Sequence, residues 1–190
     1  HQLCRVVPAF CMDQGYQRGF PGRGVQFCGD FYQGLDACDV VVAVGGDGTI
    51  IHAAKQAAMA GKPVLGINVG RLGFVAGLEV DELEQLEQLV SGRYAVENRI
   101  LLQVDSVLGG LHQTYYALND AVIARGSLSR ILDFKVLFNS PNMCDYRADG
   151  SIFSTHTGTT AYSLSAGRRV IDPSMDSNLL TPISQHSLFS

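Results

Sequence analysis

The order of apolar and polar positions divides the chain into two halves with different periodicities. The first half alternates short apolar runs with stretches of helical spacing. Its predicted elements are a strand, a helix, a strand and a helix over residues 36–44, 49–60, 63–69 and 81–90. Strands and helices in alternation, joined by short connections, indicate a parallel sheet. A short strand is also predicted over 3–7, whereas residues 8–34 have no clear period and are predicted to be loop.

The helix ends are predicted from their flanking residues. Gly61 follows the first helix as the residue that often ends a helix, and Pro63 lies just beyond it. Asp81 can cap the second helix, with Glu84 three residues later as in a capping box. Ser91-Gly92 ends that helix.

The pattern of apolar and polar residues changes after residue 97. Strand-like runs follow one another, joined by Gly, Asn and Ser turns, over residues 99–107, 113–118, 121–125, 131–138 and 180–183. No helical pattern interrupts them, which favours antiparallel β structure. The sequence therefore predicts two domains: a Rossmann-like α/β domain over 1–97 and a β-sandwich-like domain over 98–190.

Composition and charge narrow the function classes. The chain has 190 residues, of which 46% are hydrophobic and 17% charged, as in a soluble globular protein. A net charge of −4 with no Lys/Arg run argues against nucleic-acid binding, and no apolar stretch approaches membrane-spanning length. Five cysteines without CxxC spacing predict free thiols, a cytoplasmic location and no protein-held metal site. The absence of an initial Met suggests a fragment.

One short segment carries candidate chemistry. Residues 45–49, Gly-Gly-Asp-Gly-Thr, lie between the apolar run 40–44 and the Ala-rich stretch 50–55, which indicates strand, tight turn and helix. Unpaired N–H groups and the dipole at a helix N-terminus favour an anion such as phosphate, and glycines let the main chain approach it. Asp47 is unexpected in a loop that holds phosphate alone. It indicates proton acceptance or Mg²⁺ binding.

The pentapeptide resembles the signature of NAD kinases, lipid kinases of the diacylglycerol and sphingosine type, and phosphofructokinases. Four further stretches are similar to the NAD kinase family, in the same order. They are LGINVGRLGF at 65–74, ALND at 117–120, YRADG at 146–150 and STHTGTTAYSLSAG at 154–167. The chain thus resembles a bacterial-type member of the NAD kinase family, from residue 36 onward, that lacks segments at both ends.

This resemblance implies transfer of the γ-phosphoryl group of ATP to the 2′-hydroxyl of the adenosine ribose of NAD, giving NADP. It implies Asp47 as the base, Mg²⁺ or another divalent cation accompanying ATP, and a homodimer or homotetramer that shares the site between subunits. The implied nucleotide-binding residues are Gly45, Gly46, Asp47, Gly48, Thr49, His52, Phe74, Asn119, Asp120, Arg130, Arg147, Asp149, Thr160, Ala161, Tyr162, Ser163, Leu164 and Ser165.

Each candidate also has a purely structural interpretation. Asp47 could cap the following helix, and Asn119-Asp120 and Asp149-Gly150 are ordinary turn dipeptides. The Ser/Thr string 151–165 could be an edge strand with one face in solvent. His52 could be a histidine whose hydrogen bonds are satisfied within the protein. Arg130 could be an exposed arginine at a strand end, and Phe74 could be a core residue.

Four positions depart from the family pattern. Asp120 stands where the family has Glu, so its carboxylate reaches one methylene less far. His156 replaces a proline and removes a rigid φ from the substrate loop. Arg168 and Arg169 replace Gly-Pro, and so place two cations at a turn.

Two other functions remain open. A lipid kinase is disfavoured because Ile50-Ile51-His52 stands where those relatives have an Asn-Glu pair. A non-catalytic dinucleotide-binding module is the other possibility, motivated by Arg168-Arg169. A Rossmann dehydrogenase is disfavoured because no GxGxxG follows any strand.

Overall fold

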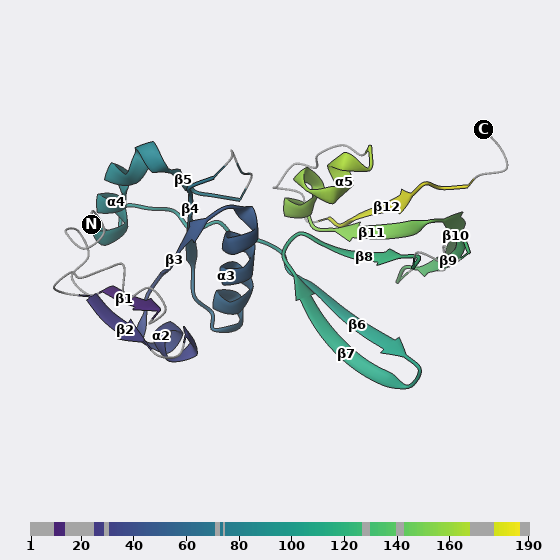
Figure 1. Cartoon of the computed structure of the whole chain (residues 1–190), viewed down its shortest axis with the longest axis horizontal. Coiled ribbons are helices and arrows are strands. Elements are labelled where there is room, and N and C mark those ends of the chain that lie inside the picture. The colour runs from purple at the N-terminus through teal and green to yellow at the C-terminus, as the bar shows by residue number, and fades with distance from the viewer. Residues whose placement is uncertain are drawn as a thin grey trace. The chain divides into compact units, whose positions relative to one another are not determined.

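The computed structural model describes residues 10–13, 25–28, 31–70, 73, 75–126, 130–139, 143–167 and 177–186. The chain divides into two units, His1–Asn98 and Arg99–Ser190 (Figure 1). Within the described residues, no helix is long and apolar enough to cross a membrane.

The first unit is built on a parallel sheet. Its strands β3 (Val41–Gly45), β4 (Val64–Asn68) and β5 (Leu78–Glu79) pair in the order β3-β4-β5. Gly45 is paired with Asn68, and Asn68 with Glu79, so the carboxyl ends of all three strands lie in one row. Such a row is where open parallel sheets carry their ligands.

Helix α3 (Asp47–Met59) joins β3 to β4 and packs on both (Figure 1). It begins two residues earlier than predicted, because Gly46 already has the extended conformation of an N-cap. Ile50 and Ala57 are its buried residues. The predicted end at Gly61 is confirmed: Gly61 has φ of 67°, and its N–H donates to Ala58 O at 3.0 Å.

The segment after β5 is helical, as predicted, but its cap is not the predicted one. It consists of the 3₁₀ helix η2 (Val80–Gln85) and helix α4 (Leu86–Val90). The cap is Glu79, whose capping box is completed by Glu82. The expected pair Asp81 and Glu84 is wrong by two residues, because β5 already ends at Glu79 and the helical turns start immediately after it. Leu86 packs with Ile67 and Leu78 in the core of this unit.

The N-terminal part contains more regular structure than predicted. Two short strands, β1 (Phe10–Asp13) and β2 (Val25–Cys28), pair in parallel, and helix α2 (Phe31–Ala37) follows. The predicted loop over 8–34 is therefore wrong at these positions, and the strand predicted from residue 36 begins only at Val41. Strand formation here depends on pairing between distant residues, which a local period does not reveal. The predicted strand over 3–7 lies outside the described residues.

The second unit is antiparallel throughout its described strands. A hairpin of β6 (Leu102–Leu108) and β7 (Leu111–Ala117) turns at Gly109-Gly110. The other strands form two sheets, one of β8 (Asp120–Ala124), β11 (Gly150–Ser154) and β12 (Leu179–Ile183), and one of β9 (Leu132–Leu137) and β10 (Met143–Ala148). A parallel first unit and an antiparallel second unit confirm the predicted fold class.

The Ser/Thr-rich string starts in the middle of a sheet. β11 lies between β12 and β8, and Ser151, Ile152 and Ser154 are buried, so the interpretation as a solvent-facing edge strand is wrong. After β11 the chain forms the 3₁₀ helix η3 (Thr157–Thr160) and the short helix α5 (Tyr162–Ser165). Helical turns were not predicted there, since four-residue helices leave no periodic signal.

Candidate nucleotide-binding site

The glycine-rich turn occupies the carboxyl end of β3. Gly45 ends the strand, Gly46 is the N-cap, and Asp47, Gly48 and Thr49 form the first turn of α3. The N–H groups of Thr49 and Ile50 already donate to Gly46 O, at 3.0 and 3.2 Å. The helix dipole adds partial positive charge at this end, so the turn favours an anionic group.

Asp47 lies against the loop that follows β4. Its Oδ1 atom is buried, and a Cβ added to Gly73 would lie 2.2 Å from that oxygen. No side chain other than glycine therefore fits at position 73 while Asp47 keeps its place. Phe74, the next predicted site residue, lies outside the described residues.

Asn68 shapes the same loop from the end of β4. It is 1% exposed; its Nδ2 donates to both carboxylate oxygens of Glu79 at 2.9 and 3.2 Å, and its Oδ1 accepts from Gly70 N–H at 3.1 Å. Buried amides are usually satisfied in this way. Sequence reasoning did not single out Asn68 or Glu79. The available signal was a polar residue closing the apolar run 64–67, level with the glycine turn of the neighbouring strand.

His52 lies one helical turn beyond Gly48 and is exposed. Its Nε2 lies 3.0 Å from the side-chain nitrogen of Gln56, which can donate to it. The imidazole is thus held on the same helix face as Gly48, since residues four apart are neighbours.

In the second unit, Asn119 lies in the turn before β8, and Asp120 is the first residue of that strand. The Thr155 hydroxyl donates to Leu118 O at 2.6 Å, and Thr155 N–H donates to Asn119 O at 2.8 Å. A Cβ added to Gly158 would lie 1.9 Å from Asn119 O, so η3 packs directly on this turn. The buried Oδ1 of Asn119 has no hydrogen-bond partner among the described residues. An orphaned acceptor of this kind suits a ligand donor.

Asp120 faces the start of α5. Burial raises the pKa of its carboxyl above the ordinary value, and a backbone hydrogen bond from Tyr162 lowers it by a smaller amount. The turn 119–120 and the run 160–165 are therefore adjacent, although they are 40 positions apart in the chain. Within the run, Ser163 and Thr181 share a hydrogen bond of 3.0 Å.

His156 stands at the position where the sequence comparison placed a proline. Its φ of −57° lies in the range that proline imposes, so the lost ring does not alter this turn. The imidazole is 3% exposed, and neither ring nitrogen has a hydrogen-bond partner within the described part of the chain. Arg168 and Arg169 lie outside the described residues.

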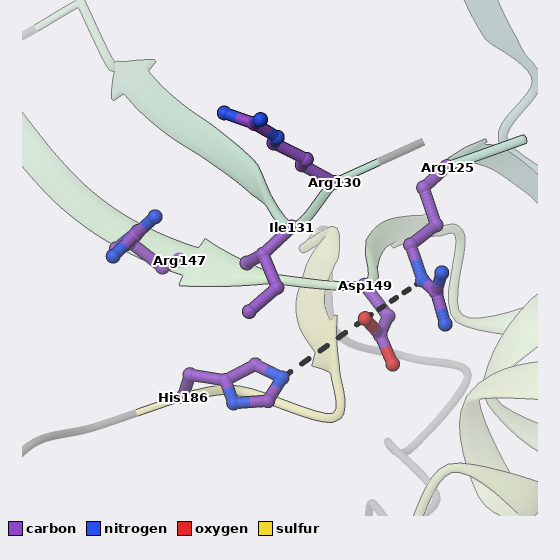
Figure 2. A pocket seen from close by; sticks show the side chains of 6 residues that line it. All are labelled: Arg125, Arg130, Ile131, Arg147, Asp149 and His186. Carbon is purple, nitrogen blue, oxygen red and sulfur yellow. Dashed lines mark ion pairs between the residues drawn. The ribbon is translucent and has the colours of Figure 1, made fainter. Parts of the chain in front are cut away.

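An open pocket of about 550 Å³ brings three predicted site residues together. It is lined by Arg125, Arg130, Ile131, Arg147, Asp149 and His186 (Figure 2). Asp149 Oδ1 forms an ion pair with Arg125 Nε at 2.9 Å, and Arg147 Nε pairs with Asp133 Oδ1 at 2.8 Å. Arg125 and His186 were not predicted. Their sequence neighbourhoods give no signal, because β8 and the end of β12 meet Asp149 only through the sheet register.

Metal binding by the protein alone finds no support in the described residues, which contain no group of three His, Cys, Asp or Glu side chains able to hold an ion. Mg²⁺ in kinases is bound by one or two carboxylates together with substrate phosphates. Asp47, at the mouth of an anion-favouring turn, fits that arrangement.

Comparison with known proteins identifies this arrangement. The model of the ATP-NAD kinase N-terminal domain matches residues 33–94, and the model of the ATP-NAD kinase C-terminal domain matches residues 118–190. The chain belongs to the ATP-NAD kinase family. Both the glycine turn and the pocket around Asp149 lie inside the matched segments.

Individual NAD kinases are similar over most of the chain. The NAD kinase of Heliobacterium modesticaldum is 43% identical over 81% of this chain, and that of Azotobacter vinelandii is 40% identical over 94%. These alignments take in 55% and 61% of the relatives, so the chain spans little more than half of their length.

Two solved structures share the fold. Yeast NADH kinase complexed with NADH matches with a TM-score of 0.79 and 25% identity, covering 93% of this chain and 52% of that one. An NAD kinase from Archaeoglobus fulgidus in complex with ATP matches with a TM-score of 0.65 and 24% identity, covering 95% and 73%.

Proposed function

We propose that the full-length protein is an NAD kinase, which transfers the γ-phosphoryl group of ATP to the 2′-hydroxyl of the adenosine ribose of NAD to give NADP. The observation that carries this proposal is the placement of Asp47. It is the single carboxylate in a glycine turn at the carboxyl end of a parallel strand, in a chain that both NAD kinase domain models match. The curated relatives named above favour this function over a lipid kinase.

Asp47 acts as the base in this proposal. The nucleophile is a weakly acidic sugar hydroxyl, and a carboxylate within hydrogen-bond reach takes its proton as the bond to phosphorus forms. Burial of Oδ1 against Gly73 limits the positions that the carboxylate can adopt. A base held in one orientation loses less entropy on reaching the transition state.

The turn itself binds phosphate. Main-chain N–H groups of Gly46 and Gly48, at the positive end of α3, neutralise the charge on the transferred group. A divalent cation accompanying ATP would neutralise charge on the phosphate oxygens, with Asp47 as the residue of this turn able to contact it. His52, one turn along the helix, contributes a further polar contact.

The second unit supplies the contacts to the dinucleotide. Hydrogen-bonding groups for ribose hydroxyls and base edges come from Asn119, Asp120 and Asp149, and cations from Arg130 and Arg147. The run 160–165 (Thr160, Ala161, Tyr162, Ser163, Leu164 and Ser165) lies beside Asp120 and adds backbone and hydroxyl contacts. Phe74 of the first unit adds a ring for stacking.

The protein acts as a homodimer or homotetramer in the cytoplasm, according to the same proposal. The resemblance to NAD kinases supports the oligomer, because their sites take residues from two subunits. Exposed apolar side chains on β6 and β7, among them Val107, Leu108 and Leu111, are compatible with a subunit contact.

Enzymatic assay of the full-length protein tests the function. Formation of NADP from NAD, or of NADPH from NADH, is measured with Mg²⁺ and with either ATP or polyphosphate as donor. The proposal expects NADP from ATP and NAD. Tight NAD binding by calorimetry without phosphoryl transfer from either donor would instead establish a dinucleotide-binding module.

A further inference from the structure

Asp149 is held by the ends of two strands. It follows β10, and its N–H donates to Ile183 O of β12 at 3.0 Å. Its carbonyl oxygen accepts from Arg125 N–H, just beyond β8, at 2.9 Å. The backbone of Asp149 is therefore fixed on both sides before its side chain makes any contact.

Two basic side chains then meet the same carboxylate oxygen. Arg125 Nε lies 2.9 Å from Asp149 Oδ1, and His186 Nε2 lies 4.0 Å from that atom. His186 is placed by its own N–H, which donates to Arg147 O at 2.9 Å. The side chains are 41%, 30% and 52% exposed for Arg125, Asp149 and His186, so the contact is partly shielded from water.

Both ion pairs of the Asp149 carboxylate are made through Oδ1. Figure 2 shows the carboxylate between Arg125 and His186, whereas the guanidinium ends of Arg130 and Arg147 lie beyond Ile131. The two arginines already placed with the dinucleotide thus do not compete for Asp149.

We propose that Arg125 and His186 are positioning residues: they hold Oδ1 of Asp149 so that Oδ2 is presented to a hydroxyl donor of the bound dinucleotide. This inference rests on the proposed function, in which Asp149 contacts that ligand. A charge-assisted hydrogen bond is shorter and about twice as strong as a neutral one, so Arg125 fixes the carboxylate rotamer before the ligand arrives. A carboxylate fixed in advance binds with a smaller entropy loss.

A double-mutant cycle on the full-length protein separates positioning from direct ligand contact. The variants are Arg125→Gln, Asp149→Asn and the pair combined, with steady-state KM for NAD, KM for ATP and kcat measured for each. Arg125→Gln is expected to raise KM for NAD about tenfold, with kcat and KM for ATP within about twofold. In the Asp149→Asn background the same change is expected to add less than about twofold, because Arg125 acts through Asp149.

Graded replacements and a control accompany the cycle. Arg125→Lys keeps the charge but not the Nε geometry, and is expected to recover part of the loss. His186→Gln is expected to raise KM for NAD only about twofold to threefold, since its nitrogen lies 4.0 Å from Oδ1. Arg93→Gln removes an exposed arginine of the first unit, which donates to Ser91, and is expected to change neither constant.

The outcomes distinguish the two levels of the proposal. Additive effects of Arg125→Gln and Asp149→Asn on KM for NAD, in an active wild type, would show that Arg125 contacts the ligand itself and would overturn the positioning role alone. A wild-type protein that neither binds NAD nor forms NADP would overturn both proposals. Thermal unfolding of each variant identifies any loss of affinity that comes from misfolding.

Discussion

The glycine turn of the first unit and the pocket around Asp149 in the second unit differ in the groups that form them. In the first unit the site is main chain: three glycines, one helix N-terminus and a single carboxylate within five consecutive residues. In the second unit it is side chains, delivered to one pocket by β8, β9, β10 and the segment after β12. At Gly45 an added Cβ would lie 2.7 Å from Thr49, so this position of the backbone site accepts no side chain. A side-chain site depends instead on which residues the strand register brings together.

Replacing the carboxylate of the backbone site is expected to have the largest effect. Asp47→Asn removes the proton acceptor and is expected to lower kcat for NADP formation about 10³-fold with little change in KM for NAD. Coupled assay of NADP production measures both constants. Asp81→Asn, an exposed carboxylate on η2, is the control. Turnover of Asp47→Asn near the wild-type rate would reject this residue as the base.

Adding one methyl group between η3 and the turn at Asn119 tests the packing of the side-chain site. Gly158→Ala places a Cβ 1.9 Å from the main-chain oxygen of Asn119, where no flexible side chain can move away. We expect a loss of about 3 kcal/mol in the free energy of unfolding, measured with urea. Gly48→Ala has open space around it and is the matched stability control. Equal stability of the two variants would contradict the packing argument.

A methyl group added at Gly73 in the first unit should lower kcat and leave the stability unchanged. Gly73→Ala places a Cβ 2.2 Å from Asp47 Oδ1, the movable end of a side chain, so the carboxylate shifts and the fold survives. We expect kcat to fall about 10- to 100-fold with an unchanged melting temperature. Gly70→Ala, in the same loop, meets Asn68 Oδ1 at an ordinary 3.7 Å and serves as the control. A large loss of stability without loss of kcat would reverse the interpretation.

The difference between a local main-chain site and a site assembled by strand register also decides how much of each the sequence could predict. The glycine turn, α3 and its end at Gly61 are local, so apolar period and turn residues predicted them. Strands β1 and β2 were missed because their pairing joins residues 15 positions apart across a segment without period. Arg125 and His186 were missed for the same reason, since they meet Asp149 only through the register of β8, β11 and β12. The family resemblance supplied Asn119, Arg147 and Asp149, which their local sequence presents as ordinary turn or strand residues.

The raised pKa of Asp120 predicts a smaller effect of pH. As pH falls, the contribution of this residue to the stability of the fold rises while the affinity for NAD falls. Burial raises the folded-state pKa above 3.8, so as pH falls the folded protein takes up this proton before the unfolded chain does. Wild type therefore gains stability relative to Asp120→Asn between the raised pKa and about pH 4. NAD affinity falls over the same interval, because the carboxylate loses its charge. Thermal unfolding and calorimetry of both proteins across this range measure the two trends.

The smallest effect is expected where an ion pair is exposed. The Arg147–Asp133 pair, at 2.8 Å, is as short as the Arg125–Asp149 pair at 2.9 Å, but its side chains are 62% and 76% exposed. Water screens such a pair, so Asp133→Asn should change the free energy of unfolding by less than about 0.5 kcal/mol and KM for NAD by less than about twofold. Arg125→Gln should raise KM for NAD more than Asp133→Asn does. Equal effects of the two variants would mean that contact length, and not shielding from water, decides which arginine positions the ligand.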